Sequence, residues 1–345
     1  MIRLGIAARQ WGIPAQKLSL LCAQQKIPGA ILAGDTWFLP DAAQKPLFAH
    51  PFLKWAGGKS RLLAEIAAHY PRHLGGGITR YAEPFVGGGA VLFHVLSSYH
   101  IQEAYLSDTN PELINVYRVV QSHVQQLIGR LEQFSAQYLS LDADARKAYY
   151  YEKRDQFNAG PSCAPNLPPD LERAALFLFL NKTCFNGLYR VNRNGQFNVP
   201  IGRYRAPEIV NAPLLRAASE ALKHVALVCG SYAQSADFID ANTFVYLDPP
   251  YRPLSATSSF TAYTQDAFGD DDQRTLAGFF AAMAKRGASL LLSNSDPKNT
   301  DPHDNFFDDL YAPFHIHRLR VGRAISAKGA GRGKISELLI SSYEH

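Results

Sequence analysis

The sequence predicts an α/β protein built around a doubly wound, mostly parallel sheet. The first observation is a short apolar run, Thr243 to Leu247, that ends in Asp248 and two prolines. Such runs are typical of parallel strands buried on both faces, and prolines cannot continue a hydrogen-bonded ladder. The second is a strand, glycine loop and helix over residues 81–98, and the third is a strand over 103–108 that ends in an acid. In open α/β sheets ligands bind beyond the carboxyl ends of strands, so we expect a site there.

The composition describes a globular protein with a substantial core. The chain has 345 residues, of which 47% are hydrophobic and 19% charged, and its net charge is +5. This balance permits a polyanionic partner without proving one. The four cysteines form no CxxC pair, which argues against zinc or a disulfide framework and favours reduced thiols. No apolar run approaches the roughly 20 residues of a membrane span and no signal peptide opens the chain, so we expect a soluble cytoplasmic protein.

Residues 1–46 are predicted to form a separate small module. Residues 4–11 are helix-like, Pro14 suits the first turn of a second helix, and residues 31–39 have the pattern of a hairpin with a Gly-Asp turn. Two helices followed by a hairpin resemble the winged helix-turn-helix of excisionase-like DNA-binding modules. The few basic residues also fit a small packing or partner-binding cap. Residues 40–51 are predicted to be a linker.

Gly58-Lys59-Ser60 lies at the start of a predicted amphipathic helix that runs to about residue 70. The tripeptide also occurs in phosphate-binding P-loops, but that loop needs a glycine five residues before Gly58, where this chain has Leu53. We therefore reject a nucleotide triphosphatase. The segment is either a glycine turn that holds an anionic group at the helix amides, beside Trp55 and Lys59, or a structural turn.

A glycine loop follows the strand that ends at Glu83. Its glycines, residues 87–89, let a ligand approach the backbone, as in the first βα turn of a doubly wound sheet. The loop is not GxGxxG, so a dinucleotide site is disfavoured. Asp108 follows the loop by about 20 positions, the spacing at which an acid meets ribose hydroxyls. These features favour an adenosine-containing cofactor, although Asp108 could instead cap the helix that begins at Pro111.

Residues 115–210 break the alternation of strands and helices and are predicted to form an insert. Basic, amide and aromatic side chains alternate over 181–205, as contact with phosphates and base edges requires. Asn194-Gly195 in this stretch predicts a hairpin. The insert is therefore a candidate substrate-recognition domain, although a solvated hairpin fits the same residues. Helices are expected near 112–137, 143–158 and 170–181.

The Asp248-Pro249-Pro250-Tyr251 segment offers hydrogen-bond acceptors and an aromatic face at a strand end. Asp248 and the Pro249 carbonyl can accept both hydrogens of an exocyclic amine, and Tyr251 can stack on the attached ring. An ordinary Asp-Pro turn fits the same residues.

The remaining segments complete the sheet and surround the site. The Ser/Thr-rich stretch 255–268 is a candidate lid over a substrate, or an ordinary surface loop. The Gly/Ala-rich stretch 323–334 carries four basic residues that suit a phosphate backbone, or that serve solubility alone. Further strands are predicted at 224–230, 288–294, 314–321 and 335–343.

Taken in order, these motifs resemble Dam-type DNA adenine methyltransferases, the alpha group of amino-methyltransferases that use S-adenosylmethionine. The resemblance covers about residues 50–345 and implies a Rossmann-like catalytic domain formed by 50–114 and 211–345, with a DNA target-recognition domain over 115–210. The N-terminal module is extra to the family plan. The motifs that carry the resemblance are Lys54-Trp55-Ala56-Gly57-Gly58-Lys59, Glu83-Pro84-Phe85-Val86-Gly87, Asp108, the hairpin of residues 186–202 and Asp248-Pro249-Pro250-Tyr251.

The resemblance also implies roles for individual residues. Asp248, Pro249, Pro250 and Tyr251 match the catalytic motif that holds a flipped adenine. Family positions that contact the cofactor are matched by Trp55, Lys59, Glu83, Pro84, Phe85, Gly87, Asp108 and Asp248. Family positions that contact DNA are matched by Lys54, Asn186, Leu188, Arg190, Pro200 and Tyr204. GATC in double-stranded DNA is the implied target, and no metal is implied. Phe185 departs from the tyrosine of close relatives, which puts one polar contact in doubt.

Two other functions stay open at this stage. A similar acid- or amide-Pro-Pro-Tyr motif serves amino-methyltransferases that act on cytosine N4, RNA or a protein amide, although the arginine-bearing hairpin argues against a protein substrate. A DNA-binding regulator with an inactive methyltransferase body is the other. In each case that involves DNA, the protein is expected in the cytoplasm, associated with the nucleoid.

Overall fold

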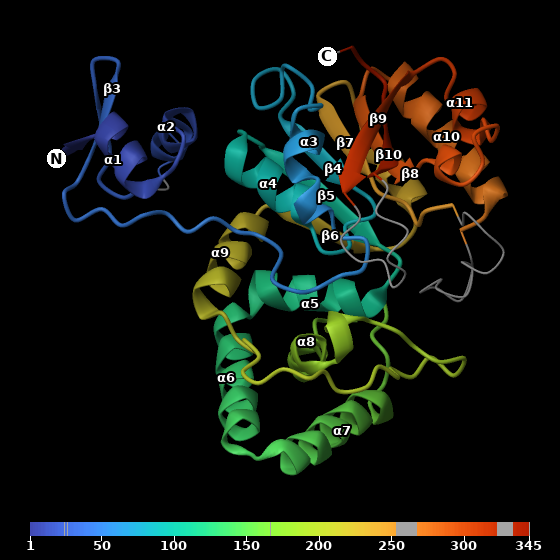
Figure 1. The fold of residues 1–345 in the computed structure, drawn as a ribbon. Helices are drawn as coiled ribbons and strands as arrows, with labels where there is room; N and C mark the ends of the chain where they lie inside the picture. Colours follow the sequence, from blue (N-terminus) through green and yellow to red (C-terminus); the bar gives the residue numbers. More distant parts are fainter. Residues whose placement is uncertain (24, 26, 166, 253–267, 323–333, 345) are drawn as a thin grey trace.

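The computed structural model describes residues 1–23, 25, 27–165, 167–252, 268–322 and 334–344. Its centre is a seven-stranded sheet in the order β6-β5-β4-β7-β8-β10-β9 (Figure 1). This order confirms the predicted doubly wound α/β fold. The strands are β4 (Arg80–Glu83), β5 (Glu103–Asp108), β6 (Val225–Cys229), β7 (Thr243–Leu247), β8 (Ser289–Ser295), β9 (His315–Gly322) and β10 (Lys334–Ser341).

The strands from β6 to β8 run parallel, and β10 and β9 complete one side in antiparallel pairing. The direction of strand addition reverses between β4 and β7, because β5 and β6 lie on one side of β4 while β7 and β8 lie on the other. In such sheets ligands bind at the carboxyl ends of the strands next to that reversal. Glu83 and Leu247 end these two strands, so the predicted sites at Glu83 and Asp248 share one edge of the sheet.

The residue pattern of β7 explains its central place. All residues from Thr243 to Leu247 are buried. Two prolines follow Asp248 and end the strand, because proline has no amide hydrogen for the ladder. In the pairing with β8, Leu247 lies opposite Leu292. One step further along both strands, Asp248 therefore lies beside Ser293.

Helices cover both faces of the sheet. Neighbouring residues of β4 show the two layers, since Tyr81 belongs to one hydrophobic cluster and Ala82 to another. The Tyr81 cluster is closed by α4 (Ala90–Ser98), α5 (Pro111–Ser122) and α9 (Ala212–Leu222). The Ala82 cluster is closed by α10 (Asp270–Lys285) and α11 (Phe306–Leu310). None of the helices in the described residues is long and apolar enough to cross a membrane.

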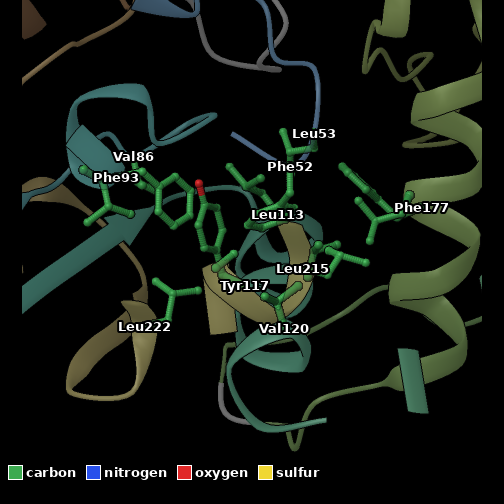
Figure 2. Packing of buried hydrophobic residues seen from close by; sticks show 14 of the residues in the cluster. Phe52, Leu53, Val86, Phe93, Leu113, Tyr117, Val120, Phe177, Leu215 and Leu222 are labelled. Atoms are coloured by element: carbon green, nitrogen blue, oxygen red, sulfur yellow. The ribbon is translucent and has the colours of Figure 1, made fainter. Parts of the chain in front are cut away.

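The helix α5 connects the sheet to the predicted insert. Beyond it lie α6 (Val124–Ser140), α7 (Ala143–Ala159) and α8 (Leu171–Thr183), drawn below the sheet in Figure 1. Figure 2 shows part of the hydrophobic cluster that they share, which runs from Phe93 of α4 through Tyr117 of α5 to Phe177 of α8. The insert is therefore packed onto the sheet through a continuous apolar core.

The N-terminal residues form a small module with its own apolar core. The two predicted helices and the hairpin are confirmed, whereas the assignment as a winged helix-turn-helix stays a prediction. Lys17 of the second helix donates hydrogen bonds to Ser97 Oγ and Ser98 Oγ at the end of α4, at 3.2 and 3.3 Å. An extended segment joins the module to the sheet (Figure 1). The elements of the module are β1 (Ile2–Arg3), α1 (Leu4–Trp11), α2 (Ala15–Ala23), β2 (Ile31–Ala33) and β3 (Thr36–Leu39).

Two predicted helices differ from those in the structure. The helix expected over 112–137 is broken at His123, so that α5 and α6 can follow different directions around the core. The helix expected to reach residue 70 is a 3-10 turn, Lys59–Arg61, followed by the short α3 (Leu63–Ala67). The candidate lid (255–268) and the basic stretch (323–334) lie outside the described residues, except for Phe268 and Lys334.

The predicted hairpin around Asn194-Gly195 is irregular. Its strand pairing is a bridge between Val191 and Phe197. The turn is built on a side chain, because Asn192 Oδ1 accepts from the amides of Asn194 and Gln196 at 2.9 and 3.0 Å. Gly195 has a φ of 75°, which a residue with a side chain rarely adopts. The predicted turn is therefore present, but it is wider than a two-residue hairpin turn.

Candidate active site and nucleic-acid interface

Asp248, just beyond β7, is the centre of the candidate site. Its Oδ1 atom forms an ion pair with Lys59 Nζ at 2.7 Å and accepts a hydrogen bond from Ser293 Oγ at 2.8 Å. Lys59 is 7% exposed, whereas Asp248 keeps 19% of its side chain exposed. The same ammonium donates to the Gly57 carbonyl at 2.8 Å, so the glycine turn holds the lysine in place. The carboxylate predicted as catalytic is thus oriented by donors from two separate elements.

The Tyr251 side chain is contacted by Lys59 on its ring face and by Glu337 at its hydroxyl. Lys59 Nζ lies 4.7 Å from the ring centroid, and the hydroxyl donates to Glu337 Oε2 at 2.9 Å. Gln273 of α10 donates to the Pro250 carbonyl at 3.1 Å, which fixes the backbone before the ring. Burial, with the charge of Asp248, raises the pKa of Tyr251 well above its ordinary value, so the hydroxyl stays protonated. The segment therefore presents a carboxylate and a fixed aromatic ring around one lysine.

Glu83, the last residue of β4, is a buried carboxyl near the ion pair of Asp248 and Lys59. It is 2% exposed and accepts a 2.6 Å hydrogen bond from the Tyr81 hydroxyl. Burial raises the pKa of Glu83 to about 8, with the Asp248 charge acting in the same direction and the Tyr81 hydroxyl and Lys59 acting against it. At neutral pH this carboxyl is therefore mostly protonated.

The glycine loop after β4 and the acid at the end of β5 are in contact. Gly87 N donates to Asp108 Oδ2 at 3.2 Å, and Asn110 N donates to Oδ1 at 2.9 Å. Gly87 has a φ of 48°, and a Cβ there would lie 2.9 Å from Cδ1 of Trp55. Burial raises the pKa of Asp108, while these backbone amides oppose the shift. A glycine lets a ligand approach the backbone closely, and a neighbouring carboxylate can accept hydrogen bonds from ribose hydroxyls, so this arrangement suits a ribose-binding loop.

An aromatic pair lies beside the glycine loop. Phe85 stacks on Tyr232, which opens the 3-10 turn η3 (Tyr232–Asp237), with ring centroids 5.4 Å apart. Phe268 meets Phe85 edge-on at 6.1 Å. The carbonyl of Pro84, one residue earlier, accepts a hydrogen bond from Ser107 Oγ at 3.4 Å. These contacts fix flat apolar surfaces at the same edge of the sheet as Asp108.

Trp55 and Lys54 join the candidate cofactor residues to the insert. The Trp55 ring stacks on Tyr189 with centroids 5.7 Å apart and planes at 19°. Asn181 of α8 brackets the backbone of Lys54, accepting from its amide at 2.9 Å and donating to its carbonyl at 2.8 Å. Two neighbouring residues before the 3-10 turn therefore connect the sheet edge to the insert.

Lys54 and Tyr204, both predicted to contact DNA, are in contact with each other. Lys54 Nζ donates to the Tyr204 hydroxyl at 3.2 Å and lies 4.4 Å from the ring centroid. The stem of Lys54 passes over Gly187, where any Cβ would collide with it. Asn186, the neighbouring residue, is exposed and has a φ of 54° in the 3-10 turn η2 (Phe185–Gly187). The structure thus gathers Lys54, Asn186 and Tyr204 at one place.

The other predicted DNA contacts lie along the hairpin. Arg190 is exposed, and its Nε donates to Asn198 Oδ1 at 2.7 Å across the hairpin. Pro200 is exposed, and its carbonyl accepts from the Phe185 amide at 2.8 Å. Leu188 is half-buried against the core. Within the described residues, the hydrogen bonds of the Arg190 side chain stay inside the hairpin.

Sequence patterns do not identify some residues that support the site. Ser293 is signalled only by its place in a polar Ser-Asn-Ser end of an apolar strand, which predicts no specific contact. Gln273, Glu337 and Tyr232 carry no local signal, because they reach the site only through the packing of α10, β10 and η3.

Comparison with known proteins identifies close relatives. Residues 55–325 match the family model described as D12 class N6 adenine-specific DNA methyltransferase. The chain is 48% identical to Type II methyltransferase M.MjaIII of Methanocaldococcus jannaschii, over 85% of this chain and 99% of that protein. It is 36% identical to Type II methyltransferase M1.LlaDCHI of Lactococcus lactis subsp. cremoris, over 85% and 95% of the two chains. It is also 36% identical to the DNA adenine methylase of Escherichia coli strain K12, over 84% and 93%. The N-terminal module precedes the residues that match the family model.

Proposed function

Because the chain belongs to the D12 class of N6 adenine-specific DNA methyltransferases, we propose that it transfers the methyl group of S-adenosylmethionine to adenine N6 in GATC sites of double-stranded DNA. Membership of this family shows that the protein is an adenine-specific DNA methyltransferase. The cofactor, the GATC target and the roles of individual residues are the content of the proposal.

The residues at the sheet edge fit S-adenosylmethionine. Asp108 offers carboxylate oxygens for ribose hydroxyls beside the bare backbone of Gly87. Lys59 uses two of its three N–H donors on Asp248 and Gly57, which leaves one for a ligand carboxylate. Phe85 and the half-exposed Trp55 supply aromatic surface nearby. When bound, the cofactor supplies an electrophilic methyl group on a sulfonium sulfur.

The chemistry of the chain is to orient an amine that is a poor nucleophile. The lone pair of adenine N6 is delocalised into the ring, so the nitrogen must become pyramidal before it reacts. Hydrogen bonds from the amine to Asp248 and the Pro249 carbonyl favour that geometry, and the Tyr251 ring holds the base plane. Alignment of this kind can supply a large share of the roughly 7–11 kcal/mol available from proximity. No covalent enzyme intermediate is needed.

The base must leave the duplex before it can reach Asp248. Extrusion costs about a few kcal/mol, which stacking and contacts in the pocket offset. We propose that Tyr204, which Lys54 contacts, occupies the neighbourhood of the vacated base. Lys54, Leu188, Arg190 and Pro200 would read the remaining base edges. Asn198 supports this role for Arg190, since it contacts Nε and Nη2 and thereby holds the guanidinium in place for a contact to guanine.

The observation that carries the proposal is the Asp248 carboxylate, held through one oxygen at the carboxyl end of β7. The test is methyl transfer from labelled S-adenosylmethionine to duplexes that contain GATC, the same bases scrambled, or no adenine. We expect transfer to GATC alone. Asp248→Ala should lower kcat by a factor of about 100 or more, whereas the exposed Asp237→Ala should behave as wild type.

Each component of the proposal has its own contrary result. Equal transfer to scrambled duplexes would remove the GATC target, and transfer to adenine-free duplexes would indicate a cytosine N4 enzyme. Cofactor binding without turnover on any duplex would support a regulator with an inactive body. Near-normal transfer by Asp248→Ala would exclude the catalytic role of that residue.

A further inference from the structure

The two donors to Asp248 reach the same oxygen. Lys59 Nζ and Ser293 Oγ both contact Oδ1, at 2.7 and 2.8 Å. Among the described residues, none donates a hydrogen bond to Oδ2. One oxygen of the carboxylate is therefore held by the protein, and the other is available as an acceptor.

Ser293 is itself held in one orientation. It is 1% exposed, and its Oγ lies 3.0 Å from the hydroxyl of Tyr246, which is equally buried. Because a serine hydroxyl has one proton and gives it to Asp248, Ser293 must accept from Tyr246. Tyr246 of β7 and Asp248, just beyond its end, are two residues apart, so they lie on the same side of the chain, and the register of β7 with β8 brings Ser293 next to them. Tyr246, Ser293 and Asp248 thus form one directed hydrogen-bond chain.

We propose that Ser293 is a positioning residue for methyl transfer, which turns the Asp248 carboxylate so that Oδ2 meets the amine of the target adenine. This inference rests on the proposed function. A single donor would leave the carboxylate free to rotate about its Cβ–Cγ bond, whereas donors from two elements define its plane. Lys59 also belongs to the candidate cofactor site, so its loss would change cofactor binding as well. Among the described residues, the Ser293 hydroxyl contacts Asp248 and Tyr246 alone, which makes Ser293 the cleaner probe.

The kinetic test compares Ser293→Ala, Ser293→Thr and Tyr246→Phe with wild type on a GATC duplex. Ser293→Ala should lower kcat by about ten-fold and change the KM values for duplex and cofactor by less than about two-fold. Ser293→Thr keeps the hydroxyl and should restore most of kcat. Tyr246→Phe should lower kcat by about three-fold, because it removes only the donor that orients Ser293.

Ser289→Ala is the matched control. Ser289 lies on the same strand four residues earlier, on the same face, at the end of β8 away from Asp248. It should retain wild-type kcat. A wild-type kcat for both Ser293→Ala and Tyr246→Phe would overturn the inference. So would equal losses in Ser293→Ala and Ser289→Ala, since these would reflect general damage to the strand.

A crystal structure of Ser293→Ala separates this inference from the proposed function. We expect the Asp248 carboxylate to rotate or to occupy more than one conformer, whatever the substrate of the enzyme. An unmoved carboxylate would overturn the positioning role even if the enzyme methylates GATC. Absence of methyl transfer by wild type, with a rotated carboxylate in the variant, would instead overturn the proposed function alone.

Discussion

The hydroxyl of Tyr251 donates a hydrogen bond to Glu337 Oε2 at 2.9 Å, which ties the end of β7 to a strand two positions away in the sheet. Glu337 pairs with Ser295 of β8 in the antiparallel ladder, so its position is set by the sheet itself. Together with Lys59 on the ring face, β10 therefore helps to fix the ring that we propose stacks on the flipped base. Stacking on the base depends on the plane of the Tyr251 ring. We therefore expect the contact with Glu337 of β10 to affect methyl transfer.

Substitutions at this hydrogen bond should separate ring position from ring presence. Tyr251→Phe keeps the stacking surface and loses the anchor, so we expect kcat/KM to fall by about three- to ten-fold. Tyr251→Ala loses both and should cost about 100-fold or more. Glu337→Gln keeps an acceptor and should stay near wild type. Methyl transfer to a GATC duplex measures all three, and a wild-type kcat/KM for Tyr251→Phe would argue against the anchor.

The buried Glu83 should make stability depend on pH. Burial raises its pKa from 4.5 to about 8, so between these values the folded protein keeps a proton that the unfolded chain has lost. This contribution to stability is fully present at low pH and is lost as the pH rises through the window. Relative to Glu83→Gln, wild type should lose about 2–3 kcal/mol of unfolding free energy between about pH 5 and about pH 7.

Urea unfolding of the two proteins at both pH values measures this difference. The exposed Glu65→Gln is the control and should follow wild type. Parallel pH dependence of wild type and Glu83→Gln would show that Glu83 is ionised in the folded protein.

A buried ion pair between α5 and α8 should be important for stability. Arg173 contacts both oxygens of Glu112, with Nε to Oε2 at 2.6 Å and Nη2 to Oε1 at 2.7 Å. Their side chains are only 9% and 6% exposed. Glu112→Ala leaves the guanidinium without its counter-charge and should cost about 3–5 kcal/mol of unfolding free energy in urea. The exposed Glu172→Ala, which breaks a similar pair with Arg130, should cost at most about 1 kcal/mol. Similar losses in both variants would contradict the importance of burial.

The sheet was predictable because its parallel strands are continuous apolar runs with sharp ends. The residues of β5 coincide with the predicted strand at Glu103–Asp108, and β7 ends at Leu247, just before Asp248 and the two prolines. The break at His123 was not predictable, because the apolar pattern continues across it and the bend serves packing against α8 and α9. Local periodicity reports which residues are buried, and it does not report where a helix must change direction to bury them.

The candidate site was predictable where one motif carries both the strand end and the polar group. Asp248 and Asp108 are of this kind, and both lie at the carboxyl edge of the sheet. Ser293 was not, since a buried serine in a strand is common and only the register of β7 with β8 brings it to Asp248. Glu337 is a similar case, because an antiparallel strand far along the sequence delivers it. Contacts between elements distant in sequence cannot be derived from local patterns.

Arg190 should read a base pair rather than a phosphate. Its Nε donates to Asn198 Oδ1 at 2.7 Å and its Nη2 to the Asn198 carbonyl at 3.4 Å, so Asn198 holds one edge of the guanidinium on the exposed hairpin. Arg190→Ala should relax discrimination at one base pair of GATC by about 1–3 kcal/mol. The measurement is kcat/KM on GATC and on duplexes with each position substituted. The exposed Arg193→Ala, at the hairpin tip, is the control and should lower transfer to all duplexes alike, if at all. Uniform weakening by Arg190→Ala would show a phosphate contact instead.

Lys17 should hold the N-terminal module against α4 without taking part in catalysis. Its ammonium donates to Ser97 and Ser98 at the last turn of α4 and lies 4.0 Å from the centroid of the Phe48 ring. A cation at this end of a helix is also favoured by the helix dipole. The contact is remote from the glycine loop, because α4 begins at that loop and extends about 13 Å away from it. Lys17→Ala should therefore weaken docking by about 1–2 kcal/mol and raise the rate of proteolytic cleavage within residues 40–51 by roughly ten-fold. Methyl transfer should be unchanged, and the exposed Lys45→Ala should alter neither quantity. A loss of transfer in Lys17→Ala would show instead that the module acts on the active site through α4.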